Sequence, residues 1–145
     1  MAKAYASAVI PAPIDKVWTL VRDFNGLPVW HSGIASSDIE DGRSADSIGC
    51  VRSFHLKDGT HVRERLVSLD DAGRRLSYNF VKPAFAVTNY LAWIRLSPIT
   101  ATAETFAEWG ANFDEAPEDA GRYEEIISVH VFATGWKALT DYLRG

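Results

Sequence analysis

The sequence predicts an α+β fold in which a curved antiparallel sheet of about seven strands wraps around one long C-terminal helix. Helical spacing of apolar residues occurs near both ends of the chain, whereas apolar and polar residues mostly alternate between them. The closing helical stripe is long enough to cross a sheet. It consists of Val129, Phe132, Trp136, Leu139 and Leu143. Because a sheet that curls around one helix can leave a hollow, this arrangement suggests a bound small molecule.

The first predicted elements are a strand and two short helices. Residues 3–10 alternate loosely and predict the strand, and Pro13 suits the first turn of the helix that follows. The apolar stripe of that helix is Ile14, Val17, Trp18 and Val21. Residues 27–30 predict the second short helix, and the Ser- and Asp-rich residues 34–47 predict a weak edge strand followed by a loop.

The clearest hairpin joins residues 48–56 to residues 60–69 around the loop 57–59. A three-residue loop with a left-handed glycine sets Thr60 opposite Leu56, and a two-residue loop would shift this pairing by one residue. We favour the first register because it separates an apolar face from a polar face, and a one-residue slip would mix the two. Its apolar face contains Cys50, Phe54, Leu56, Val62 and Leu66.

Three more strands follow. Residues 76–80 alternate and predict the next strand of a meander, residues 88–97 predict a strand ended by Pro98, and residues 101–113 predict the last strand. We expect one face of this last strand to carry Ala103, Ala107, Trp109, Ala111 and Phe113. The acidic run 114–119 favours the start of the final helix because negative charge complements the helix dipole.

Composition narrows the function classes. The chain has 145 residues, which predicts a single domain over residues 1–145. A net charge of −4 argues against a nucleic-acid partner. The single cysteine, Cys50, excludes an internal disulfide and should be buried and inert. Because no stretch approaches the ~20 apolar residues of a membrane span, we expect a cytoplasmic protein without a membrane span.

The order of elements and four groups of motifs resemble the START-like or Bet v 1-like helix-grip superfamily, and in particular its bacterial polyketide cyclase/dehydrase (SRPBCC) branch. The motifs lie along nearly the whole chain. They are Pro13-x4-Trp18 with Asp23-Phe24 and Trp30; Gly49-x2-Arg52 with Asp58-Gly59 and Glu64-x-Leu66; Asp70 to Tyr78; and Tyr90 through Trp109 and Phe113. Members of the superfamily include lipid and hormone carriers, aromatic-ring cyclases and chaperone regulators. The resemblance therefore implies a helix-grip fold but does not choose among these functions.

Arg52 and Glu64 form the most specific candidate site in the sequence. In the favoured register they face each other across the hairpin, on its apolar face. Burying charges is costly unless they are paired, and the guanidinium fork of arginine suits a carboxylate. The pair is either a polar anchor that orients an acid, carbonyl or enolate group of a ligand, or a structural ion pair that sets the register. Both interpretations remain open at this point.

Aromatic side chains are candidate contacts for an apolar ligand, and the hydroxyl groups of Tyr78 and Tyr90 could form hydrogen bonds with it. The set comprises Phe54, Tyr78, Phe80, Tyr90, Trp109, Phe132 and Trp136. The alternative is a filled core, which is the usual position of aromatic residues. The resemblance places Trp30 and His31 at the mouth of the cavity, and Phe85 is a candidate for the opposite lip.

Two histidine hypotheses follow. His31 is either a general base, since the pKa of histidine lies near neutrality, or an exposed loop residue. His55 and His61 should be neighbours on the outer face of the hairpin. Because a metal site needs three or four ligands, we predict that this pair binds no metal. No nucleophile elbow or glycine-rich phosphate loop is present, and no cofactor is predicted.

The sequence thus favours a protein that binds an apolar or aromatic, lipid- or polyketide-like small molecule between its sheet and its last helix. The first alternative is a polyketide cyclase/dehydratase-type enzyme, in which His31 or Glu64 moves a proton and Arg52 stabilises enolate charge. The second is a regulatory domain that binds a protein partner at its surface. A monomer and a homodimer paired through edge strands are both compatible with the sequence.

Overall fold

The computed structural model describes residues 1–145. Its strands are β1 (Ala2–Ile10), β2 (Ile34–Ile39), β3 (Val51–Leu56), β4 (His61–Asp70), β5 (Arg75–Lys82), β6 (Val87–Ile99) and β7 (Glu104–Glu115). Its α-helices are α1 (Ile14–Val21), α2 (Leu27–Trp30), α3 (Arg122–Glu125) and α4 (Thr134–Leu143). A π-helix, η3 (Ile126–Ala133), joins α3 to α4, and η1 (Glu40–Gly42) and η2 (Pro117–Asp119) are short 3₁₀ turns.

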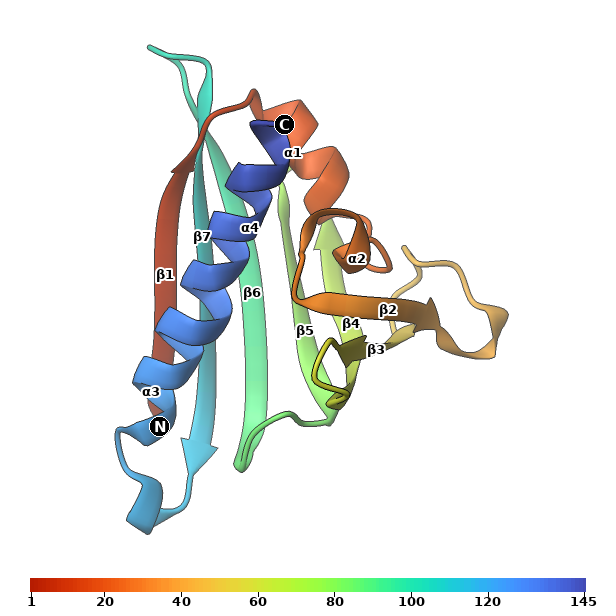
Figure 1. Ribbon diagram of the computed structural model, residues 1–145, viewed down its shortest axis with the longest axis vertical. Coiled ribbons are helices and arrows are strands. Elements are labelled where there is room, and N and C mark those ends of the chain that lie inside the picture. Colours follow the sequence, from red (N-terminus) through yellow and green to blue (C-terminus); the bar gives the residue numbers. More distant parts are fainter.

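The seven strands form one antiparallel sheet in the order β1-β7-β6-β5-β4-β3-β2. The sheet curves so strongly that β2 lies crosswise to β1, and the C-terminal helix runs along the concave side beside β1 and β7 (Figure 1). Helices α1 and α2 cap the same side near the end of α4 (Figure 1). The predicted helix-grip architecture is therefore confirmed. No helix is both long enough and apolar enough to cross a membrane.

The predicted register of the β3–β4 hairpin is also confirmed. The Leu56 N–H donates to the Thr60 carbonyl at 2.9 Å, and Gly59 adopts a left-handed φ of 93° that closes the three-residue loop. Arg52 consequently pairs with Glu64 across the two strands. The alternation of apolar and polar residues thus translates directly into which side chains face the concave side.

Two strand boundaries differ from the sequence prediction. Pro98 does not end β6, which continues to Ile99. Its pairing with β5 stops at Arg95, so the strand has a neighbour only on the β7 side beyond that point, and a proline is tolerated at such an edge. Ala103 was expected inside the last strand but lies in the preceding turn with a positive φ of 58°.

The predicted stripe of the last helix is wrong at Val129, which is 47% exposed. The buried hydrophobic side chains of this segment are Tyr123, Ile127, Phe132, Trp136 and Leu139. The step from Ile127 to Phe132 spans five residues because both lie in the π-helix η3, whose wider turn shifts the buried face. A constant helical spacing of three or four residues cannot anticipate this shift.

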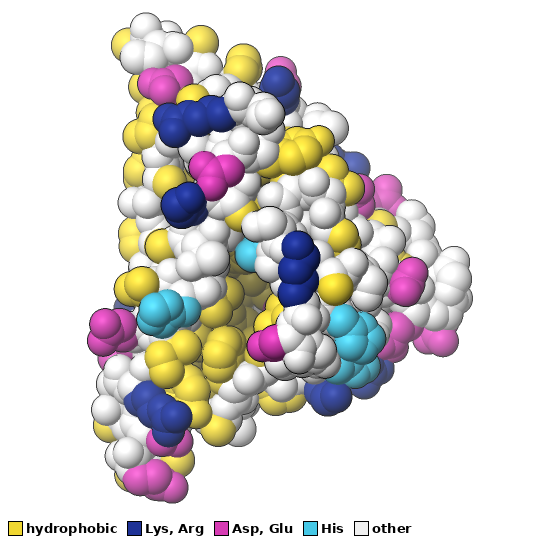
Figure 2. Space-filling view, in the orientation of Figure 1, with side chains coloured by type: hydrophobic (Ala, Val, Ile, Leu, Met, Phe, Trp, Pro, Cys, Tyr) yellow, Lys and Arg dark blue, Asp and Glu magenta, His cyan; other side chains and the backbone are white.

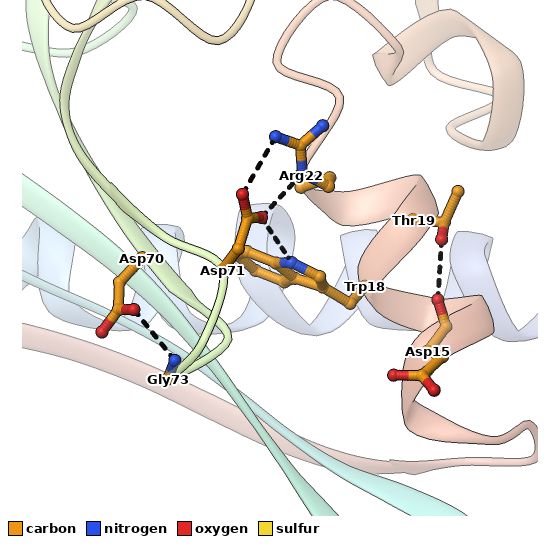
Figure 3. A network of polar contacts seen from close by, with 7 residues as sticks. All are labelled: Asp15, Trp18, Thr19, Arg22, Asp70, Asp71 and Gly73. Carbon is orange, nitrogen blue, oxygen red and sulfur yellow. Dashed lines mark hydrogen bonds and ion pairs between the residues drawn. The ribbon is translucent and has the colours of Figure 1, made fainter.

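A polar network fixes α1 to the turn between β4 and β5 (Figure 3). Asp71 accepts hydrogen bonds from Trp18 Nε1 at 2.9 Å and from Arg22 Nε at 2.8 Å. These bonds lower the pKa of the Asp71 carboxyl, with the Arg22 contact as the larger cause. Asp70 closes the turn itself by accepting from the Gly73 N–H at 2.9 Å. The network positions α1, and with it the α2 segment at one edge of the concave side.

Candidate functional site

A cavity of about 280 Å³ lies between the concave face of the sheet and the C-terminal helix. Of its 18 lining residues, 12 are hydrophobic. Figure 2 shows the hollow opening between the C-terminal helix and the β2–β3 region, with hydrophobic side chains on its walls. Ligand pockets typically measure ~300–1,000 Å³, so the volume of this cavity lies near the lower end of that range and suits a small ligand.

Nine of the residues singled out in the sequence line this cavity. The polar residues are His31, Arg52 and Glu64. The aromatic residues are Phe54, Tyr78, Phe80, Phe85, Tyr90 and Trp109. The strands supply most of them because inward-facing residues recur with a period of two along each strand. Phe85 comes from the loop between β5 and β6, and His31 follows α2.

Three predicted ligand contacts do not line the cavity. Phe132 is fully buried and stacks on Trp109 with a ring separation of 5.0 Å. Trp136 packs against the same indole at 5.2 Å and donates from Nε1 to the Ala6 carbonyl. Trp30 is buried beside His31, at 5.7 Å between ring centroids. Phe132 and Trp136 fill the space between the C-terminal helix and β1 and β7, whereas Trp30 is buried on α2.

Arg52 and Glu64 form a buried ion pair in the cavity wall. Arg52 Nε and Nη2 lie 2.9 and 2.7 Å from the same oxygen, Glu64 Oε1, and Arg52 Nη1 donates to the Phe24 carbonyl at 3.1 Å. The guanidinium carbon lies 4.0 Å from the centroid of the Phe24 ring and 4.9 Å from that of Tyr78. Aromatic faces favour a cation, so the surroundings stabilise the charge that Glu64 balances.

Burial raises the pKa of the Glu64 carboxyl, while the charge and hydrogen bonds of Arg52 act in the opposite direction. Its Oε2 atom accepts no hydrogen bond from the protein. Two fully buried side-chain atoms of the chain lack a partner, Arg74 Nε and Asn79 Oδ1, and Glu64 Oε2 is not one of them. The small exposed fraction of Glu64 therefore includes this oxygen, on a residue that lines the cavity.

Two phenols and an indole form a second polar group in the wall. Trp109 Nε1 donates to the Tyr78 hydroxyl oxygen at 2.9 Å, and the Tyr90 ring lies 6.5 Å from the Tyr78 ring. Burial raises the pKa of both tyrosines. Both hydroxyls therefore stay protonated at neutral pH and can donate hydrogen bonds.

His31 lines the cavity as a half-buried residue, not as an exposed loop histidine. Its Nδ1 accepts a hydrogen bond from the Gly33 N–H at 3.1 Å, which leaves Nε2 as the protonated nitrogen of the neutral ring. Burial lowers its pKa. The ring is thus arranged as a hydrogen-bond donor, because the lone pair that a general base needs is already engaged.

Sequence reasoning missed several lining residues. The π-helix η3 contributes His130 and Val131, and α4 contributes Thr134. Leu27 comes from α2 and Ala84 from the β5–β6 loop. Only the alternation in the strands could have indicated such positions, and these residues lie outside strands.

The histidine pair of the hairpin and the single cysteine do not line the cavity. His55 and His61 stack on the outer face with ring centroids 4.5 Å apart, as the register predicts. Ser53 Oγ and Lys82 Nζ contact the two nitrogens of His61. Cys50 is fully buried, and burial raises the pKa of its thiol, which makes it unreactive.

Comparison with known proteins places this geometry in a family. The abscisic acid receptor PYL7 of Arabidopsis thaliana is 30% identical over 92 residues, which are 61% of this chain and 42% of the receptor. The chain thus matches less than half the length of that relative. A solved structure from Thermobifida fusca is 36% identical, with a TM-score of 0.86 over 99% of this chain and 95% of the other.

An uncharacterised protein from Bacillus thuringiensis has the same fold. It is 28% identical, with a TM-score of 0.87 over 99% of this chain and 100% of the other. The profile of the family described as polyketide cyclase/dehydrase and lipid transport matches residues 1–141. The chain therefore belongs to the polyketide cyclase/dehydrase and lipid-transport family.

Proposed function

We propose that the protein binds a small apolar or aromatic molecule in the cavity between the sheet and the C-terminal helix. The observation that carries the proposal is a hollow of about 280 Å³ with largely hydrophobic walls and a buried ion pair, Arg52–Glu64, among its lining residues. Apolar walls supply binding energy, and a few placed polar groups supply orientation. Burying roughly 150 Å² of apolar ligand surface would contribute about 4 kcal/mol.

The family supports binding as the general activity. Its description includes lipid transport, and PYL7 is named as a receptor for abscisic acid. The site of this chain is also arranged in advance, because the polar groups of Arg52, Tyr78 and Trp109 are held by hydrogen bonds within the protein. Such preorganisation reduces the entropic cost of binding.

A cavity-filling variant tests this proposal. Ala84 lines the cavity and is half-buried in a loop, so Ala84→Phe adds volume at the opening without disturbing a strand. The neutral fluorescent probe N-phenyl-1-naphthylamine should bind the wild type and bind Ala84→Phe at least about tenfold more weakly. The matched control is Val67→Phe at an exposed position of β4, which should bind as the wild type does. Absence of binding to the wild type, or equal binding to Ala84→Phe, would contradict the proposal.

One observation favours the enzymatic alternative of a cyclase/dehydratase-type reaction. Glu64 is a buried carboxyl with a raised pKa in a cavity, which is a common setting for an acid–base group. His31 is the weaker candidate because the Gly33 N–H occupies its Nδ1. Native mass spectrometry of the protein purified from its own host would identify a retained compound. Incubation of that compound with the protein would then show turnover if the enzymatic alternative holds, and an unchanged compound if the protein only binds.

A further inference from the structure

We propose that the polar group of the ligand is an uncharged hydroxyl that donates to Glu64, so that the site selects neutral phenols over carboxylates of the same size. This inference rests on the proposed function, because it concerns the chemistry of the molecule that the cavity holds. It replaces the expectation that Arg52 orients an acid or an enolate.

The first step is that the charge of Arg52 is already balanced. Its Nε and Nη2 both donate to Glu64 Oε1, at 2.9 and 2.7 Å, and Nη1 donates to the Phe24 carbonyl. The rings of Phe24 and Tyr78 lie against the guanidinium. A ligand carboxylate would therefore meet a neutral ion pair and not an available cation.

The second step is that the cavity offers a free acceptor. Glu64 Oε1 takes both bonds from Arg52, whereas Oε2 takes none and retains accessible surface on a cavity-lining residue. A ligand that covers this oxygen without supplying a donor would leave it buried and unsatisfied, which is costly, so a ligand that supplies a donor is favoured. A hydroxyl does this and can also accept from a neighbouring tyrosine.

The third step is that no buried residue of the wall other than Arg52 is available to compensate a second negative charge. Tyr78 and Tyr90 are neutral phenols, and His31 is held neutral by its bond from Gly33 and by burial. His130 also lines the cavity, but it is an exposed residue, whereas Glu64 is buried in the wall. A carboxylate placed beside Glu64 would thus create a like-charge pair in a largely apolar cavity, which disfavours its binding.

Three ligands with the same ring system separate the possibilities by calorimetry at neutral pH: 2-naphthol, 2-naphthoate and 2-methylnaphthalene. The wild type should bind 2-naphthol roughly tenfold or more tightly than 2-naphthoate. Equal or tighter binding of 2-naphthoate would overturn the inference and leave the proposed function intact. Failure of all three ligands together with N-phenyl-1-naphthylamine would instead contradict the proposed function, and this inference with it.

Glu64→Gln gives the decisive variant. It keeps the shape of the side chain but leaves the Arg52 charge unbalanced, so the preference should reverse toward 2-naphthoate. The matched control is Glu108→Gln, which removes the carboxylate that pairs with Arg95 at 2.9 Å on another part of the sheet, and its preference should remain that of the wild type. If Glu64→Gln does not fold, the double variant Arg52→Gln/Glu64→Gln should bind both ligands with similar affinity. Retention of the naphthol preference in either Glu64 variant would refute the inference.

Discussion

Replacing Arg52 with methionine should lower the free energy of unfolding by about 3–5 kcal/mol, because it leaves Glu64 buried without a counter-charge. Arg52 Nε and Nη2 both lie within 2.9 Å of Glu64 Oε1, and at this separation the attraction between two unit charges is worth about 6 kcal/mol at an effective dielectric constant of 20. Loss of the bond to the Phe24 carbonyl adds about 1.5–3 kcal/mol. Relief from burying the guanidinium offsets part of this sum, and methionine preserves the packing of the aliphatic stem.

Urea unfolding followed by tryptophan fluorescence measures this loss. The matched control is Arg95→Met, which breaks an ion pair of similar length whose arginine is 49% exposed, and it should cost less than about 1 kcal/mol. The double variant Arg52→Met/Glu64→Leu should recover most of the stability, since it removes the unpaired charge as well. A loss below about 1 kcal/mol in Arg52→Met, or no recovery in the double variant, would refute the reasoning.

The destabilisation of Arg52→Met should also depend on pH. Burial raises the pKa of Glu64 in the folded state above its value in the unfolded chain, and the variant removes the arginine that opposes this shift. The folded state therefore binds more protons than the unfolded state above the ordinary pKa of glutamate, so the stability of the variant falls as pH rises through this window. We expect a larger loss near about pH 8 than near about pH 5, and a loss that does not change between them would contradict the assignment.

Three further outcomes are expected. Asp71→Asn removes the ion pair with Arg22 and lowers the stability of the fold at neutral pH. Because the pKa of Asp71 is depressed in the folded state, the difference in stability from the wild type should shrink as pH falls through that folded pKa. Thermal unfolding at several pH values measures this difference. Gly135→Ala places a Cβ 2.6 Å from Cζ3 of Trp109, so it should lower the free energy of unfolding by about 1–3 kcal/mol. It should also weaken binding of N-phenyl-1-naphthylamine, because the indole is pushed into the cavity. Unchanged binding would show that the indole moves in another direction. Val129→Ser should change stability by less than about 0.5 kcal/mol, since the side chain is exposed, and a loss typical of a core position would mean that η3 does not turn it outward.

Much of the sheet was predictable because its information is local. The loop 57–59 and the alternation on either side of it are sufficient to set Arg52 opposite Glu64, and the structure has that pairing. The same period of two predicted which aromatic residues of the strands face inward, among them Phe54, Tyr78 and Trp109.

The C-terminal helix was predicted less well because its buried face depends on a change of helix type. Val129 fits an ideal α-helical stripe, yet the π-helix η3 moves it into solvent and turns His130 toward the cavity opening. Likewise, nothing local connects Asp71 with Trp18, since their hydrogen bond joins a β-turn to a helix 53 residues away.

The sequence by itself determined the family, the order of the elements, the hairpin register and the identity of the buried ion pair. The order of the elements, the register and the ion pair follow from periodicity, turn chemistry and the cost of burying an unpaired charge, whereas the family was inferred from the resemblance of its motifs. Only the tertiary structure decided that Phe85 lines a hollow whereas Phe132 and Trp136 fill the core, and that Glu64 keeps an oxygen free beside that hollow. An inward side chain meets either space or another side chain according to where the helix crosses the curved sheet, and that position is set by the packing of the whole chain.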